Sequence, residues 1–279
     1  MADEERHPHA RRVLLEHLPE YAESALRLLG EGWDFRSYLV GEKLVLRLPK
    51  GPFAAYRLRQ EAKVLSLVEG RLGVATPHLR LVGDGPPLAG IYPWLRGEPL
   101  ALDAVSGPAL GEFLRRLHDV PRGEVRDAGI AWFPWPGGGR GWEGGLRGFR
   151  AFALRRLAGI LHDEELARID RHFARFLGRR ENFTFEARLI HGDLAPEHLL
   201  DTGAGGLGAV IDFGDAGLGD PAYDVRPEWT DWYGQVSAGF RRRQLFYRSL
   251  EPLHASIHAM ETGDETPLHA VAEHLRQVT

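Results

Sequence analysis

Two short apolar runs in the last third of the chain each end at an aspartate, and this pair constrains the fold more than any other feature. Residues 189–200 read LIHGDLAPEHLL and residues 209–215 read AVIDFGD, with a glycine-rich turn between them. Apolar runs that end at glycine and aspartate are typical of buried strands followed by turns. We therefore expect Asp193 and Asp212 to follow two buried segments joined by a hairpin-sized connection.

Two carboxylates in this order suit phosphoryl transfer. That reaction needs one carboxylate to orient the attacking hydroxyl and another to hold Mg²⁺ against the phosphates. Kinases carry them in H-R-D-L-x-x-x-N and D-F-G, and this chain carries them in HGDLAPEH and IDFG, with Gly192 for the arginine and His198 for the asparagine. Each motif alone is short enough to arise by chance. Both together, in order, favour a kinase.

On these motifs the chain resembles the aminoglycoside phosphotransferase family, small-molecule antibiotic kinases that share the protein-kinase fold. Gly192 is the form that this family uses. The resemblance covers nearly the whole chain and implies an α+β, two-lobed fold. Residues 1–95 would form a small antiparallel-sheet lobe that binds nucleotide, and residues 96–279 a large, mostly helical lobe for catalysis and substrate binding.

The nucleotide-covering hairpin of the family falls on residues 30–40 and 44–49, two strand-like runs around a tight turn. In the resemblance, Ser37 and Arg47 are its cofactor-binding residues. Arg47 stands where the family usually has lysine, and an arginine can also bind phosphate, with two of its nitrogens at once. From the hairpin alone, an exposed strand residue is an equally good interpretation of Arg47.

A helix predicted over residues 56–68 carries Glu61. A lone glutamate on a helix is usually solvated, but its spacing from Arg47 matches the kinase ion pair between a strand cation and a helix glutamate. Further along, the resemblance places the purine of the nucleotide beside Tyr92 and Trp94, at the hinge that follows the last strand of the first lobe.

The implied mechanism assigns one role to each charged residue. Asp193 accepts or orients the proton of the acceptor hydroxyl, Asp212 binds Mg²⁺ that bridges the phosphates of ATP or GTP, and Arg47 neutralises charge on those phosphates.

His198 departs most from the usual set, because Mg²⁺ prefers oxygen ligands. Either the neutral imidazole binds the ion weakly, or it only hydrogen-bonds the loop. A zinc site of His191, Glu197 and His198 is a weaker alternative, since Pro196 interrupts the segment and the spacing is not a recurrent zinc pattern.

The acceptor is suggested by an acidic stretch, residues 212–231, in which Arg226 is the one basic residue. Such a wall attracts a cationic small molecule, for example an aminoglycoside. In the family the segment 220–224 is chiefly structural and braces the catalytic loop, which leaves Glu228 and Asp231 as substrate candidates. The acidic residues of the stretch are Asp212, Asp215, Asp220, Asp224, Glu228 and Asp231.

Three functions fit these residues. The first is an antibiotic kinase for an aminoglycoside or a macrolide, and the second is a metabolic kinase for an amino alcohol or sugar. The third is a nucleotide-binding pseudokinase, because Arg47 and His198 both depart from the usual catalytic set. Turnover of nucleotide that depends on an acceptor would exclude the pseudokinase.

Three tryptophans in residues 131–142, among prolines and glycines, indicate an irregular loop, either a lid over the substrate or a segment anchored by its rings. The run Arg241, Arg242 and Arg243 is expected on a helix surface. Apolar spacing predicts helices in further stretches, residues 11–29 with a break at Pro19, 109–118, 149–161, 166–177 and 240–275.

Composition excludes several classes of partner. The formal net charge is −4 and basic residues form no stripe, which argues against nucleic acid. The absence of cysteine excludes disulfides and thiolate catalysis and fits a reducing cytoplasm. With no long apolar run and a polar, acidic start, we expect a cytoplasmic protein without membrane contact. No obligate protein partner is implied.

Overall fold

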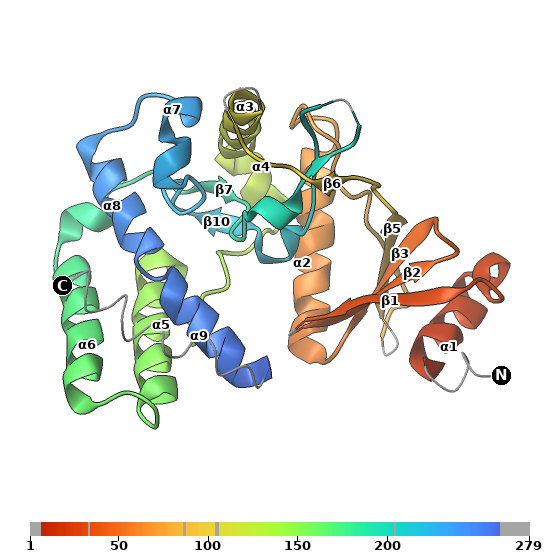
Figure 1. Ribbon diagram of the computed structural model, residues 1–279, viewed down its shortest axis with the longest axis horizontal. Helices are drawn as coiled ribbons and strands as arrows, with labels where there is room; N and C mark the ends of the chain where they lie inside the picture. Colours follow the sequence, from red (N-terminus) through yellow and green to blue (C-terminus); the bar gives the residue numbers. More distant parts are fainter. Residues whose placement is uncertain (1–6, 33, 86–87, 104–105, 204, 263–279) are drawn as a thin grey trace. The chain divides into compact units, whose positions relative to one another are not determined.

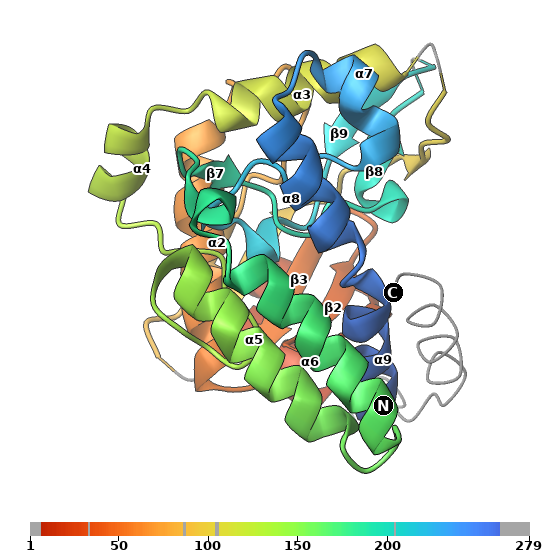
Figure 2. The same ribbon diagram turned by 90° about the vertical axis from the view of Figure 1, so that its left-hand side faces the viewer.

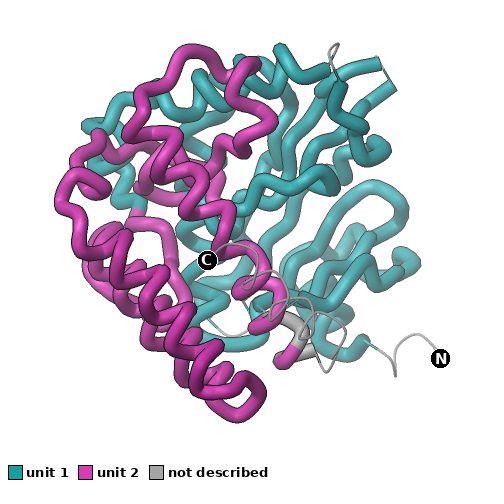
Figure 3. The backbone as a smooth tube through the Cα atoms, turned by 60° about the vertical axis from the view of Figure 1, so that its left-hand side comes forward, with its two compact units in different colours: residues 1–130, 193–216 teal, residues 131–192, 217–279 magenta. Residues whose placement is uncertain are grey.

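The computed structural model describes residues 7–32, 34–85, 88–103, 106–203 and 205–262. The chain forms two compact units, and it crosses between them more than once (Figure 3). Unit 1 comprises residues 1–130 and 193–216, and unit 2 comprises residues 131–192 and 217–279. The short return segment therefore places both motif aspartates in unit 1. A lobe boundary at residue 95 remains a prediction.

Unit 1 contains a five-stranded antiparallel sheet in the order β1-β2-β3-β5-β4 (Figure 1). The β2–β3 hairpin matches the one predicted from the sequence, and its register sets Ser37 opposite Arg47. The strands are β1 Leu26–Glu31, β2 Phe35–Val40, β3 Leu44–Pro49, β4 Arg80–Val82 and β5 Ala89–Pro93.

Alternation along β3 decides where Arg47 points. Successive side chains of a strand point to opposite faces, and Leu46 and Leu48 belong to the core that helix α1 (Pro8–His17) covers. Arg47 therefore points to the other face of the sheet. There helix α2 (Pro52–Val68) contributes Ala54 and Leu58 to a separate core.

Helix α2 extends the helix predicted over residues 56–68 by one turn at its start. Gly51 precedes it and Pro52 occupies its first position, where a missing N–H costs nothing. Its buried face includes Leu58, Glu61 and Leu65, at steps of three and four. A carboxylate on the buried face of a helix needs a partner, and the strand arginine supplies it.

The helix predicted over residues 11–29 is wrong in its second half. Helix α1 ends at His17, a 3₁₀ turn covers Pro19–Tyr21, and the next element is strand β1. Apolar residues in this stretch satisfy helical and strand spacing alike, so pairing with β2 decided the outcome.

The rest of unit 1 brings the two motifs together. A small sheet in the order β6-β8-β9 contains a hairpin in which Leu199 pairs with Val210, which is the connection expected between the two motifs. Its elements, with the neighbouring helices, are β6 Glu98–Pro99, α3 Gly107–His118, α4 Arg122–Asp127, η3 Pro196–His198, β8 Leu199–Asp201, β9 Leu207–Val210 and η4 Phe213–Asp215.

Unit 2 is mostly helical, and α5 and α6 pack along each other (Figure 2). The predicted helices are present, although α5 begins inside the stretch expected to be irregular, and residues 263–275 lie outside the described part. The elements are α5 Gly141–Leu157, α6 Asp163–Leu177, η2 Arg180–Phe183, β7 Arg188–Ile190, β10 Gly217–Gly219, η5 Pro227–Trp229, α7 Thr230–Tyr233, α8 Ala238–Arg248 and α9 Glu251–Thr262. No helix in the described ranges is long and apolar enough to cross a bilayer.

Two of the three tryptophans in residues 131–142 are core residues. Trp135 and Trp142 are buried, with ring centroids 5.1 Å apart in an edge-to-face arrangement, and both contact Tyr223. Trp132 is partly exposed. Edge-to-face aromatic packing stabilises such a cluster beyond its buried area. The contacts therefore favour the anchoring interpretation of this segment over a mobile lid.

The arginine run in α8 corrects another expectation. Arg241 is exposed, but Arg243 is buried and its Nε donates to Asp220 Oδ2 at 2.5 Å. Tyr247, one turn further along α8, donates its hydroxyl hydrogen to the same oxygen at 2.9 Å. The third residue of the run is thus a structural ion-pair partner, because helical periodicity turns it into the core.

Candidate active site

The loop that leads to Asp193 is held by a buried carboxylate. Asp224 accepts hydrogen bonds from the backbone N–H of His191 at 2.6 Å and of Gly192 at 2.8 Å. Gly192 has a φ of 84°, which glycine adopts without strain. The bracing role expected for the 220–224 segment is confirmed. Its effect is to fix the two residues that directly precede Asp193.

His198 lies between the two motif aspartates. Its Nδ1 is 2.7 Å from the backbone oxygen of Asp193. A carbonyl oxygen can only accept, so Nδ1 carries the hydrogen in this contact, and in the neutral form of the ring the lone pair is then on the other nitrogen, Nε2. That Nε2 is 3.8 Å from Asp212 Oδ2. His198 therefore hydrogen-bonds the loop through Nδ1, and its Nε2, which can bind a metal ion, lies on the side of Asp212.

Asp212 lies two residues after β9 and directly before η4, in the left-handed region, with a φ of 63°. Few residues with a Cβ adopt this conformation, and aspartate is one of those that tolerate it. Directly before it, the N–H of Ile211 donates to the backbone oxygen of His198 at 3.0 Å. Such strained positions cluster at functional sites. Here the turn projects a carboxylate that remains 43% exposed.

Arg47 and Glu61 form the predicted ion pair, with Nη1 and Oε1 2.6 Å apart. Both side chains are buried, and the Arg47 guanidinium also lies 4.3 Å from the centroid of the Phe35 ring. Burial lowers the pKa of Arg47, but the carboxylates of Glu61 and Asp212 outweigh it, so its pKa lies above the ordinary value. Burial raises the pKa of Glu61 and Arg47 opposes that shift. The alternative of an exposed strand arginine is wrong.

These contacts join into one line of charged groups within unit 1. Arg47 Nη2 lies 3.5 Å from Asp212 Oδ1, and His198 continues the line from Asp212 to Asp193. The line thus runs from Glu61 through a buried cation to two exposed carboxylates. Residues far apart in the sequence thus bring together a cation and carboxylates, the kinds of charged group that phosphoryl transfer uses.

The donor set fits a divalent ion that also binds phosphate. Two candidate ligand atoms, Asp212 Oδ2 and His198 Nε2, lie 3.8 Å apart. No cluster of three metal-ligating side chains exists among the described residues. Mg²⁺ characteristically takes one or two protein ligands and fills its remaining positions with water and substrate phosphate. The same observation gives the zinc alternative no support, since a structural zinc site needs four ligands.

Of the other expected cofactor residues, Ser37 and Tyr92 lie on the same sheet and Trp94 directly follows it. Ser37 is half-buried opposite Arg47, and burial raises the pKa of the Tyr92 hydroxyl on β5. After β5, the N–H of Trp94 donates to the backbone oxygen of Lys43 at 2.8 Å, and the Arg96 guanidinium lies 5.1 Å from a Trp94 ring centroid. Their roles in nucleotide binding remain predictions.

The two substrate candidates belong to unit 2. Glu228 lies in η5, 3.8 Å from Arg226 Nε, and Asp231 lies in α7. Both are solvent-exposed. Asp220 and Asp224 of the same acidic stretch are instead buried in structural hydrogen bonds. Exposure thus separates the two candidates from Asp220 and Asp224, and their contact with an acceptor remains a prediction.

One residue at this site escaped the sequence analysis. Arg57 of α2 binds Asp34, and it also binds the backbone oxygen of Gly214 and the carboxylate of Asp215, which are the last residue of the Asp-Phe-Gly motif and the residue after it. Its only signal in the sequence is its place one helical turn before Glu61.

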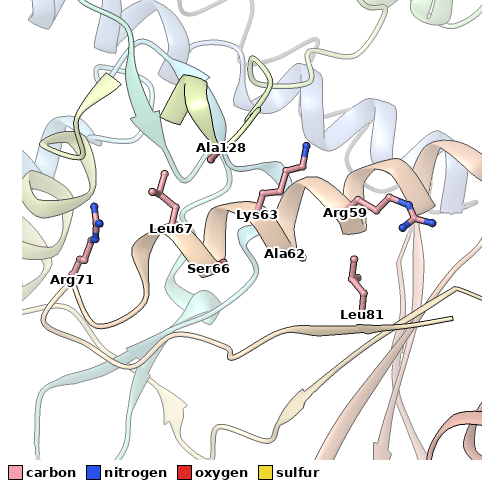
Figure 4. A pocket seen from close by; sticks show the side chains of 8 residues that line it. All are labelled: Arg59, Ala62, Lys63, Ser66, Leu67, Arg71, Leu81 and Ala128. Atoms are coloured by element: carbon pink, nitrogen blue, oxygen red, sulfur yellow. The ribbon is translucent and has the colours of Figure 1, made fainter. Parts of the chain in front are cut away.

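A surface pocket of about 640 Å³ lies against α2 (Figure 4). Arg59, Lys63 and Arg71 line it, together with small and apolar side chains. Neither the Arg47–Glu61 pair nor the two motif aspartates line this pocket. It is therefore distinct from the line of charged groups described above.

The comparison with known families decides the classification. A model of the phosphotransferase enzyme family matches residues 25–259. The chain belongs to this family. The matched segment includes all of the sheet of unit 1 and both motifs, and the family predicted from those motifs is confirmed. This member of the family is an enzyme, an O-phosphotransferase.

Solved structures of similar fold are other phosphotransferases. APH(2")-IIia, in a complex with GDP and kanamycin, has a TM-score of 0.78 at 20% identity over 96% of this chain and 97% of its own. Macrolide 2'-phosphotransferase MphH from Brachybacterium faecium has a TM-score of 0.64 at 24% identity, over 90% and 92% of the two chains. The streptomycin and ATP complex of APH(2")-IIa has a TM-score of 0.65 at 20% identity, over 94% and 97%. The predicted α+β, kinase-like fold class is confirmed. No curated protein matches the chain significantly.

Proposed function

We propose that this phosphotransferase moves the γ-phosphoryl group of ATP or GTP to a hydroxyl of a small molecule, an aminoglycoside or a related antibiotic such as a macrolide. One observation carries the proposal. The buried Arg47–Glu61 pair, Asp212, His198 and Asp193 form a continuous line in one compact unit. Cations, a metal-binding carboxylate and an exposed carboxylate in this order match the parts of a kinase site.

Asp193 acts on the acceptor. Its side chain is exposed, so it can take the proton of the hydroxyl while the oxygen forms a bond to the γ-phosphorus. The bond from that phosphorus to the bridging oxygen breaks at the same centre, and nucleoside diphosphate leaves. Asp193 then returns its proton to solvent.

Arg47 and Glu61 act on the donor. Glu61 holds the guanidinium by one nitrogen, Nη1, and Nη2 is directed at Asp212 Oδ1. An arginine held in this way is pre-organised for phosphate and loses little side-chain entropy when it binds.

Asp212 and His198 would hold the Mg²⁺ that accompanies the nucleotide. When bound, the ion neutralises charge on the phosphates. His198 in place of an oxygen ligand favours ions that accept imidazole, such as Mn²⁺, more than an asparagine would. We expect His198→Asn to keep substantial activity, because an amide oxygen suits Mg²⁺.

The acceptor class rests on charge and on likeness. Glu228 and Asp231 expose carboxylates that a cationic acceptor would contact. Several solved structures of this fold are described as complexes with kanamycin, streptomycin or gentamicin. Both points support an aminoglycoside.

The decisive test is nucleotide turnover with Mg²⁺, measured with ATP and GTP separately against aminoglycosides, macrolides, amino alcohols and sugars. Stimulation by an aminoglycoside or a macrolide supports the proposal. Stimulation by an amino alcohol or sugar alone would replace it with a metabolic kinase. Silence across the panel, in a protein that binds nucleotide, would favour the pseudokinase.

Asp193→Asn sharpens this test. We expect turnover to fall by about 10³-fold or more while nucleotide binding persists, because the group that orients the hydroxyl is lost. Glu197→Gln is the matched control, since this exposed carboxylate belongs to the same loop. A fully active Asp193→Asn variant would end the proposed mechanism.

A further inference from the structure

Arg57 of α2 makes an unusual set of contacts one helical turn before Glu61. Its Nη1 donates to Asp34 Oδ2 at 2.6 Å. Its Nη2 and Nε donate to the backbone oxygen of Gly214 at 3.0 and 3.4 Å, and Nη2 also contacts the Asp215 carboxylate. Only 18% of the side chain is exposed. One guanidinium therefore serves three separate acceptors.

The three acceptors belong to two different parts of the proposed site. Asp34 directly precedes β2 at the turn from β1, and the N–H of Lys50 donates to its backbone oxygen at 2.8 Å, which anchors that turn to the end of β3. Gly214 and Asp215 lie in η4, directly after Asp212. Under the proposed function, the first part approaches the nucleotide phosphates and the second carries the metal-binding carboxylate.

We infer that Arg57 is a positioning residue that couples the β1–β2 turn to the loop after Asp212, so that binding of the divalent ion and of the nucleotide strengthen each other. The inference rests on the proposed function. A coupling of this kind needs a physical link between the two binding parts, and the arginine is such a link. The planar fork of arginine donates in several directions at once, whereas lysine offers one compact charge.

Arg57 contributes charge as well as geometry. Asp34 and Asp215 both contact its guanidinium, so without it two carboxylates would face each other and the incoming phosphates. Carboxylates close to a bound phosphate repel it and weaken its binding. Loss of charge and loss of the link should therefore be separable, because a lysine restores the first and not the second.

The experiment is calorimetric titration of the full chain with non-hydrolysable ATP and GTP analogues, with and without Mg²⁺. The ratio of the two affinities measures the coupling. Arg57→Met should lower this ratio about tenfold, the effect expected for one charge-assisted hydrogen bond, and should also weaken binding without Mg²⁺. Arg57→Lys should keep the metal-free affinity close to wild type and still lose the coupling.

Two further variants test the link itself. Asp34→Asn should lower the coupling as Arg57→Met does, and the double variant should lower it no further, because both remove one connection. Arg59→Met is the control. This arginine lies on the same helix, is exposed, and donates to the backbone oxygen of Asp84.

The outcomes separate this inference from the proposed function. Wild-type protein that binds no nucleotide would overturn the proposed function. Wild-type coupling retained in Arg57→Met, or fully additive losses with Asp34→Asn, would overturn only the role of Arg57. A purely structural role predicts equal losses with and without Mg²⁺ and weaker binding of adenosine and guanosine, and this result would also overturn it. If Arg57→Met does not fold, Arg57→Lys and Asp34→Asn give the same decision.

Discussion

Among the described residues, each compact unit contains a buried arginine–carboxylate pair, and the two pairs differ in how many of their polar atoms are hydrogen-bonded. In unit 2, both oxygens of Asp220 accept hydrogen bonds, from Arg243, from the Tyr247 hydroxyl and from the N–H of Ala222. In unit 1, the Arg47–Glu61 pair leaves Arg47 Nε and Glu61 Oε2 buried without a hydrogen-bond partner in the described residues.

This difference is the one expected between a structural hydrogen-bond network and a ligand-binding site. A buried polar network that satisfies every atom rigidifies the fold, whereas an unsatisfied buried atom needs an explanation. The unit 2 network extends to Trp142, whose Nε1 donates to the Tyr247 hydroxyl at 2.8 Å, and it ends in the aromatic core. The unit 1 pair adjoins the exposed carboxylate of Asp212. The unpaired polar atoms of this pair are what we expect beside a ligand-binding site.

The largest expected effect is on stability, from Arg243→Met in unit 2. Removing one partner of a buried pair leaves Asp220 charged and unpaired, which should lower the free energy of unfolding by about 3–5 kcal/mol. Denaturant unfolding measures this change, and Arg241→Met, at an exposed position of the same run, should change it by less than about 0.5 kcal/mol. Equal stability of the two variants would contradict a structural role for Arg243.

The next effect is on turnover, from Arg47→Met in unit 1. If Arg47 stabilises the phosphates as proposed, its loss should lower kcat/KM for the nucleotide about 100-fold, or about 2.7 kcal/mol. Arg47→Lys should recover part of the activity, because the usual family residue restores the charge. Turnover close to wild type, together with a large loss of stability, would show that both pairs are of the same structural kind.

A third effect is a pH dependence in the aromatic core of unit 2. His254 stacks on Phe149, with ring centroids 4.4 Å apart, and its Nε2 is buried without a hydrogen-bond partner in the described residues. Burial lowers the pKa of His254 to about 4 from the ordinary 6.5. The unfolded chain therefore takes up this proton at a higher pH than the folded chain does.

The sign of the effect follows from this order. The stability that neutral His254 contributes is fully present above pH 6.5, and it is lost as the pH falls toward 4, by up to about 3 kcal/mol. Thermal unfolding between pH 4 and 7 measures the loss, and His254→Phe should remove that part of the slope. His9→Gln, at an exposed position in unit 1, is the control. An unchanged slope in His254→Phe would rule out this residue as its source.

Much of the site was predictable because its signals are local. The two motifs located Asp193, Asp212 and His198, and the spacing of Glu61 from Arg47, which matches the kinase ion pair, located Glu61. Arg57 and Arg243 were missed, since an arginine on a helix looks solvated until the elements packed against it are known. The strand over Leu26–Glu31 was missed for the same kind of reason, because its partner strand lies outside the local pattern.

The sequence by itself determined the family, the fold class and the two aspartates, because these depend on short motifs and on the periodicity of single elements. Only the tertiary structure decided that Arg47 points toward α2, that His198 bonds the loop through Nδ1, and that Arg57 joins two distant segments. The physical reason is that burial and pairing of a charged side chain depend on its neighbours in space. Apolar periodicity reports which face of an element is buried, and it does not report which charges meet there.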